Sequence, residues 1–161
     1  MLGRPGGVCS LILSSTLSSA AQWTEQTAQL FEALGPGASQ EDYDAAHMCR
    51  LDPPPPEFEE WKAKRNRAVY HAMWGPNEWT CTGALAGWDV RDRIREIDVP
   101  TLVIRGGYDA CTPPIAETMV NGITGAEYAV FEHSAPLPFV EEPARYREVL
   151  VDFLERVEAA L

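Results

Sequence analysis

The sequence of 161 residues is long enough for one domain with a real core, and 45% of its residues are hydrophobic. Its formal net charge of −11 argues against partners such as nucleic acid or an anionic membrane, and no apolar run approaches the about 20 residues of a membrane span. Four scattered cysteines and three histidines lack the close spacing of a zinc site, so we expect no metal or cofactor and a reducing, cytoplasmic environment.

The first predicted element is a buried strand over about 8–14. Residues 1–7 are rich in turn-forming Gly and Pro, and the apolar run Val8-Cys-Ser-Leu-Ile-Leu13 follows them. The same stretch, with Arg4 before it and Ser18-Ser-Ala-Ala21 after it, imitates a secretory signal peptide. We favour the strand because the apolar run is short and interrupted by serines.

Residues 16–94 are predicted to be a helical insert. The first helix is expected over about 20–34 and ends at Gly35-Pro-Gly37. A second helix is expected over about 39–49, with Ser39 as its N-cap. These helices precede a proline run that no helix can include.

The rest of the insert is less regular. Pro53–Pro56 is expected to form a stiff extended connector, and one helix is expected over 57–73. The apolar positions of that helix are Phe58, Trp61, Val69 and Met73. Residues 80–98 have a mixed pattern, in which we expect Trp88 and Ile94 to be buried.

The last third alternates between strands and helices. Strands are predicted over 100–105 and 127–131, a helix opens at Pro113, and a final helix opens after Glu141. The apolar stripe of the final helix is Tyr146, Val149, Leu150, Phe153, Leu154, Val157 and Leu161. Strand–helix–strand–helix order predicts a parallel α/β layer built from residues 1–15 and 95–161, with 16–94 as a helical cap.

Asp109 carries the most informative chemical pattern. It follows the strand 100–105 after two glycines, and a proline-opened helix comes next. An acid on the loop after a parallel strand is where α/β hydrolases keep the third member of a Ser-His-Asp triad. The alternative is an aspartate that only makes a turn.

Four segments together resemble the C-terminal half of the proline iminopeptidases (prolyl aminopeptidases), which are cap-bearing α/β hydrolases. The string Gly75-Pro-Asn-Glu-Trp-Thr80 is the most specific of them. The segments are Gly7–Ser15, Met73–Thr80, Trp88-Asp89 with Ile97–Ile104, and Phe139–Pro143. The resemblance implies the C-terminal part of an α/β-hydrolase fold, with about three parallel strands, flanking helices and a helical cap.

The resemblance also implies roles for single residues. Asp109 matches the triad acid, and Glu78 matches a cap glutamate that binds the free α-amine of a peptide with N-terminal proline. Trp79 could line a proline-sized pocket, although tryptophans in a small cap are more often core. The implied reaction releases N-terminal proline through an acyl-enzyme on serine.

The chain departs from this family in two places. It contains no Gly-x-Ser-x-Gly motif, and the position expected for the catalytic histidine holds Pro136, with His133 three residues earlier. We therefore expect an inactive fragment that begins after the nucleophile, and only a doubtful catalytic role for His133. The alternatives are a non-catalytic binding or regulatory module, or half of a split hydrolase. In either case the exposed edge of the strand 8–14 invites self-association.

Overall fold

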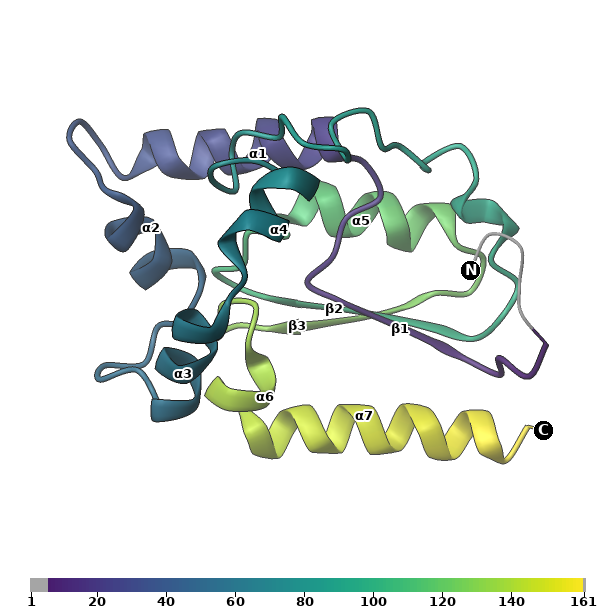
Figure 1. The fold of residues 1–161 in the computed structure, drawn as a ribbon. Coiled ribbons are helices and arrows are strands. Elements are labelled where there is room, and N and C mark those ends of the chain that lie inside the picture. Colours follow the sequence, from purple (N-terminus) through teal and green to yellow (C-terminus); the bar gives the residue numbers. More distant parts are fainter. Residues whose placement is uncertain (1–5, 161) are drawn as a thin grey trace.

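A three-stranded parallel sheet forms the centre of residues 6–160, the part of the chain that the computed structural model describes (Figure 1). The strands β1 (Leu11–Ser14), β2 (Thr101–Gly106) and β3 (Glu127–Phe131) lie in the order β1-β2-β3. Leu11 pairs with Thr101, and the next residues of β1 pair in order with the next residues of β2, up to Ser14 with Ile104. Every residue of β2 is buried, as expected for a central strand that is covered on both faces.

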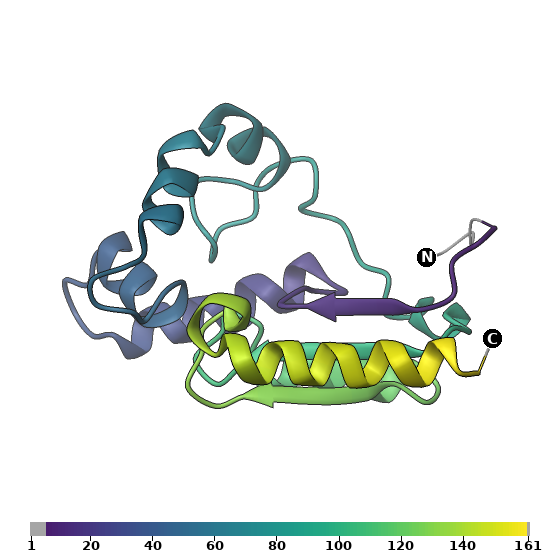
Figure 2. The same ribbon diagram turned by 90° about the horizontal axis from the view of Figure 1, so that it is seen from below.

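One helix covers each face of the sheet (Figures 1 and 2). The helix α5 (Pro113–Gly122) packs on the face that carries Val103, and α7 (Pro143–Glu158) packs on the face that carries Leu102 and Ile104. Successive side chains of a strand point to opposite faces, so one apolar run supplies both layers of the core. The predicted stripe of the last helix faces this core at Tyr146, Val149, Phe153, Leu154 and Val157. Leu150 is half-buried outside this cluster, and Leu161 lies outside the described residues.

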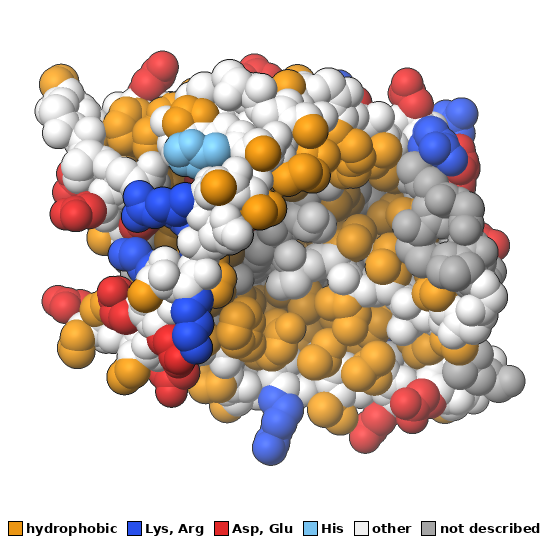
Figure 3. Space-filling model, viewed as in Figure 1, with side chains coloured by type: hydrophobic (Ala, Val, Ile, Leu, Met, Phe, Trp, Pro, Cys, Tyr) orange, Lys and Arg blue, Asp and Glu red, His pale blue; other side chains and the backbone are white. Residues whose placement is uncertain are grey.

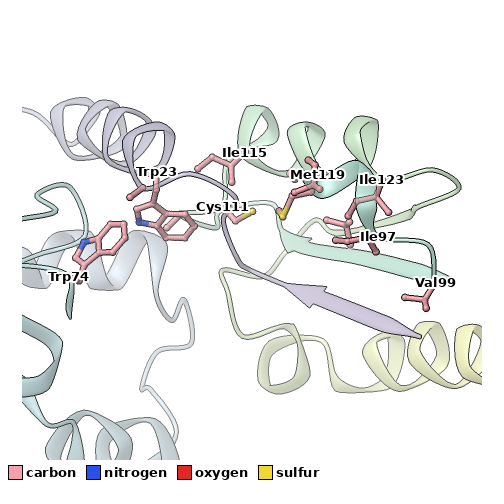
Figure 4. Packing of buried hydrophobic residues seen from close by; sticks show 13 residues of the cluster. Trp23, Trp74, Ile97, Val99, Cys111, Ile115, Met119 and Ile123 are labelled. Carbon is pink, nitrogen blue, oxygen red and sulfur yellow. The ribbon is translucent and has the colours of Figure 1, made fainter. Parts of the chain in front are cut away.

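The helix α1 (Ala20–Ala33) joins the helical segment (residues 16–94) to this core. Ser19 caps α1 by accepting the N–H of Gln22, and the Gln22 side chain donates to the Thr118 hydroxyl of α5 at 2.8 Å. Trp23 is 7% exposed and meets Trp74 edge to face, with ring centroids 6.5 Å apart. Figure 4 shows both rings at the end of the cluster that continues through Cys111 to α5. The α1 helix is therefore fixed to the sheet layer by both apolar and polar contacts.

The remaining helices are short. They are α2 (Gln40–His47), α3 (Pro56–Lys64), α4 (Arg67–Met73), the 3-10 turn η1 (Ile94–Glu96) and α6 (Pro138–Glu141). The prediction of one helix over 57–73 was wrong, because Asn66 interrupts it. The Asn66 side chain accepts the N–H of Val69 at 3.1 Å and so caps a new helix. Pro56 also differs from the prediction, since it is the first residue of α3, where its missing N–H costs nothing.

The prediction that Trp88 is buried was also wrong, whereas Ile94 is buried as expected. Trp88 is 38% exposed and lines a groove of about 390 Å³ beside Leu11 and Leu13 of β1. Within the described residues β1 pairs with β2 alone, and all four of its residues are only partly buried. Figure 3 shows hydrophobic side chains gathered around a hollow on this face. No helix within residues 6–160 is long and apolar enough to cross a bilayer.

We expect Phe153→Ala to lower the free energy of unfolding by about 3–5 kcal/mol, because it leaves a cavity between α7 and the sheet. Phe153 is 1% exposed, whereas Phe139 is 52% exposed. Phe139→Ala is the matched control and should cost less than about 1 kcal/mol. Urea denaturation followed by circular dichroism measures both changes, and equal losses would contradict this assignment of the core.

Candidate functional site

Asp109 lies on the loop at the carboxyl end of β2, where it meets the loop that follows β3. The two loops approach closely at Gly106, where an added Cβ would lie 2.1 Å from the carbonyl oxygen of Ala135. Glycine is therefore required at this position. The contact places the segment 132–137 directly against the Asp109 loop, on the edge of the sheet where α/β folds build their sites.

The Asp109 carboxylate is 2% exposed and accepts three hydrogen bonds. One oxygen accepts from the Ser15 hydroxyl at 2.6 Å and from the Gly106 N–H at 3.2 Å, and the other accepts from the Cys111 N–H at 2.8 Å. Burial raises the pKa of Asp109, while these donors and the nearby Arg105 act to lower it. The acid is thus held in one orientation by β1, by its own loop and by the start of the next helix.

Ser15 was not among the predicted site residues. It follows β1 directly and has φ of 47°, in the left-handed region that non-glycine residues seldom adopt. Its Oγ also lies 3.3 Å from the carbonyl oxygen of Pro136. The carboxyl ends of adjacent parallel strands lie at the same edge of a sheet. A prediction that β1 pairs with β2 would therefore have placed Ser15 near Asp109.

Among the described residues, no histidine donates a hydrogen bond to Asp109, although the triad pattern predicts one. Pro136 occupies the predicted position, and His133 is exposed on the same loop, with its backbone N–H donating to Glu142 at 3.1 Å. The Ala135 N–H donates to Glu141 at 2.7 Å, so two adjacent carboxylates fix this loop. The other oxygen of Glu141 accepts the N–H of Arg50, at 2.7 Å, from the helical segment.

Glu78 lies in the loop after α4 and is half-buried. One carboxylate oxygen accepts the Tyr70 hydroxyl at 2.7 Å, and the other accepts the indole N–H of Trp23 at 3.3 Å. Burial and the charge of Glu78 both raise the pKa of Tyr70, which keeps the phenol neutral and able to donate. Glu78 and Tyr70 line a cleft of about 360 Å³.

Trp79 is half-buried in an aromatic cluster with Phe31 and Tyr43. Its ring stacks on Phe31 at 4.0 Å and lies 5.0 Å from Tyr43, centroid to centroid. Tyr43 is fully buried, and its hydroxyl has no hydrogen-bond partner among the described residues. This contact set places Trp79 mainly in the packing between α1 and α2.

The pKa of the Tyr43 hydroxyl is affected by both Glu78 and Asp109. Burial raises the pKa of Tyr43, and the charges of Glu78 and Asp109 raise it further. The helix α2 also contacts the neighbours of both carboxylates: Tyr43 lies beside Trp79, and the His47 ring lies 2.8 Å from the carbonyl oxygen of Tyr108. The structure thus brings Glu78, Trp79 and Asp109 into one region and leaves the His133 side chain exposed on the loop after β3.

Cys111 lies beside the Asp109 loop but is not placed as a nucleophile. The thiol of Cys111 is fully buried and donates to the carbonyl oxygen of Thr16 at 3.2 Å, and burial raises its pKa strongly. A neutral, enclosed thiol is a poor nucleophile. Within residues 6–160, no three His, Cys, Asp or Glu side chains are arranged to hold a metal ion.

Comparison with known proteins gives consistent relatives. No protein-family model matches the chain. It is 35% identical to the proline iminopeptidase of Lactobacillus delbrueckii subsp. lactis, over 94% of this chain and 58% of the relative. It is 36% identical to the proline iminopeptidase of Clostridioides difficile (strain 630), over 94% of this chain and 59% of the relative. The chain therefore spans less than two thirds of these curated relatives.

Solved structures agree with the sequence comparison. The crystal structure of VinJ superposes with a TM-score of 0.88 at 29% identity, covering 97% of this chain and 60% of VinJ. The proline iminopeptidase of Mycobacterium smegmatis gives 0.84 at 28% identity, with 99% and 60% covered. The predicted resemblance and fold class are confirmed. Over nearly its whole length this chain is a homologue of the proline iminopeptidases, and its fold is that of an α/β hydrolase.

Proposed function

We propose that this chain carries the amine-binding carboxylate and the triad acid of a proline iminopeptidase-type site, which acts on peptides with N-terminal proline. The observation that carries the proposal is that α2 contacts the neighbours of both residues: Tyr43 packs on Trp79, next to Glu78, and the His47 ring lies 2.8 Å from the carbonyl oxygen of Tyr108, next to Asp109. The similarity to enzymes named proline iminopeptidase supports it. We further propose that residues 1–15 and 95–161 form the partial hydrolase core and that 16–94 form its cap.

In this proposal Glu78 binds the ammonium group of the N-terminal proline. Each carboxylate oxygen of Glu78 already accepts one hydrogen bond and can accept another. A charged acceptor in a partly buried cleft favours an ammonium group over the neutral amide of an internal residue. Recognition of the free amine would therefore restrict the site to peptide N-termini.

Asp109 serves in this proposal as the acid that orients a histidine and stabilises its protonated form. The reaction also needs a serine nucleophile and a base. Pro136 has neither a ring donor nor a ring acceptor, and Oδ2 of Asp109 already accepts from the Ser15 hydroxyl, which also lies 3.3 Å from the Pro136 carbonyl oxygen. We propose that these 161 residues alone bind the amine but do not cleave the peptide bond.

A half of a split hydrolase, or a binding module, remains the second candidate. The observation that favours it is the edge of β1 with which no other strand of residues 6–160 pairs, beside the apolar groove of Leu11, Leu13 and Trp88. An uncovered strand edge of this kind pairs readily with another chain, including a second copy. The four free cysteines fit the proposed cytoplasmic location.

We expect prolinamide to bind this chain and N-acetylprolinamide to bind it more weakly, because acetylation removes the positive charge. Glu78→Gln should weaken prolinamide binding by about tenfold to a hundredfold. Glu41→Gln is the matched control, since Glu41 lines the same cleft but is exposed. Isothermal titration calorimetry measures these affinities, and equal binding of the two amides would refute amine recognition.

We expect no hydrolysis of proline p-nitroanilide by the purified chain, because the donors to Asp109 include no histidine. The release of nitroaniline is followed by absorbance. The control is His133→Ala, which should change nothing. Turnover that disappears in His133→Ala would show that the loop after β3 rearranges to form a triad.

We expect Ser15→Ala to raise the pKa of Asp109 further above its ordinary value of 3.8, because the hydroxyl stabilises the carboxylate. A raised pKa in the folded state means that stability falls as pH rises from the unfolded value through the folded one. The variant should therefore lose about 1–3 kcal/mol, and more at pH 7 than at pH 4.

Ser15→Gly separates the hydrogen bond from the backbone strain, because glycine adopts φ of 47° freely. Both variants should raise the pKa of Asp109, while only Ser15→Ala keeps the strain. Carboxylate NMR titration follows the pKa, and an unchanged value in both variants would show that Ser15 does not hold the acid.

A further inference from the structure

We infer that the cleft beside Glu78 continues into an apolar groove that receives the side chain of the residue after the N-terminal proline. This inference rests on the proposed function and names its substrate more closely. The peptides that fit are those in which proline is followed by a large apolar residue. The inference rests on residues that line both the Glu78 cleft and the apolar groove, and on the position of Pro136 in the groove, close to the Asp109 loop.

The groove lies between α3 and α6 and has a volume of about 530 Å³. Figure 1 shows these two helices at the same end of the molecule, beyond the carboxyl ends of the strands. In the described part of the chain, all its lining residues but Glu57 are apolar. The principal ones are Phe58 and Trp61 from α3 and Leu137, Phe139 and Val140 from the segment after β3.

The groove and the Glu78 cleft are neighbours that share part of their lining. Met48, Phe58 and Trp61 line both of them. A bound peptide can therefore extend from Glu78 along this shared wall into the groove without leaving the protein surface. One extended residue spans about 3.3–3.6 Å, so the second residue of the peptide begins within one residue length of the amine site.

The direction of the peptide follows from Pro136, which also lines the groove. Its carbonyl oxygen lies 3.3 Å from the Ser15 Oγ that donates to Asp109. The groove thus shares one wall with the Glu78 cleft and includes Pro136, which lies next to the Ser15–Asp109 pair. A peptide with its amine on Glu78 that runs toward the Asp109 loop therefore places its second residue in the groove.

The walls of the groove select for apolar side chains. Trp61 is 47% exposed and Phe139 is 52% exposed, so together they present apolar surface at the groove. Phe58 stacks on Trp61 at 5.6 Å and holds that ring in place. Covering these rings with an apolar side chain removes apolar surface from water, whereas a glycine leaves them exposed.

The experiment compares Pro-Phe-NH2 with Pro-Gly-NH2 on the full 161-residue chain by isothermal titration calorimetry. We expect Pro-Phe-NH2 to bind about tenfold more tightly, from burial of the phenyl ring. Phe139→Ala should reduce this ratio toward one and leave Pro-Gly-NH2 binding unchanged, because Phe139 lines the groove but not the Glu78 cleft. Phe139 is 52% exposed, so its removal leaves the core intact. Trp88→Ala, which removes an exposed tryptophan from another groove, should keep the ratio.

The outcomes separate this inference from the proposed function. Equal affinities for the two dipeptide amides, with both lost in Glu78→Gln, would overturn the groove inference and leave amine recognition standing. Affinity for N-acetyl-Pro-Phe-NH2 equal to that for Pro-Phe-NH2 would overturn the proposed function instead. An equal loss of the ratio in Phe139→Ala and Trp88→Ala would also overturn the inference, because the selectivity would not come from the groove.

Discussion

The buried carboxylate of Asp109 is the interaction on which the arrangement of the site depends. A charge that is 2% exposed is tolerated only when donors surround it, and here Ser15, Gly106 and Cys111 supply them. These donors come from the end of β1, the end of β2 and the start of α5. One acid therefore fixes the relative position of two strand ends and a helix, and it does so whether or not the chain catalyses a reaction.

The sheet layer was predictable because its signals are local and strong. A continuous apolar run marks β2, and a stripe at three- and four-residue spacing marks α7. The helical segment was harder to predict. The break at Asn66 depends on one side chain that competes with the helical backbone for an N–H group, and the exposure of Trp88 depends on packing between distant segments.

The residues of the candidate site also differ in whether the sequence selected them. Asp109 and Glu78 stand in recognisable sequence strings, so a single sequence was enough to select them. Ser15 and Tyr43 carry no such signal, because their roles follow from which strand pairs with which and from which charges surround a buried phenol. Local sequence patterns do not specify contacts between residues that lie 94 positions apart, as the Ser15–Asp109 pair does.

Glu141 has a mechanical consequence for this fold. Its two oxygens bind backbone N–H groups on opposite sides of the junction, Arg50 in the helical segment and Ala135 in the loop after β3. Any hinge motion that lifts the helical segment must either break a 2.7 Å hydrogen bond or pull on the loop that carries Pro136. While both hydrogen bonds hold, movement of the helical segment away from the sheet layer also displaces that loop, with one carboxylate as the linkage.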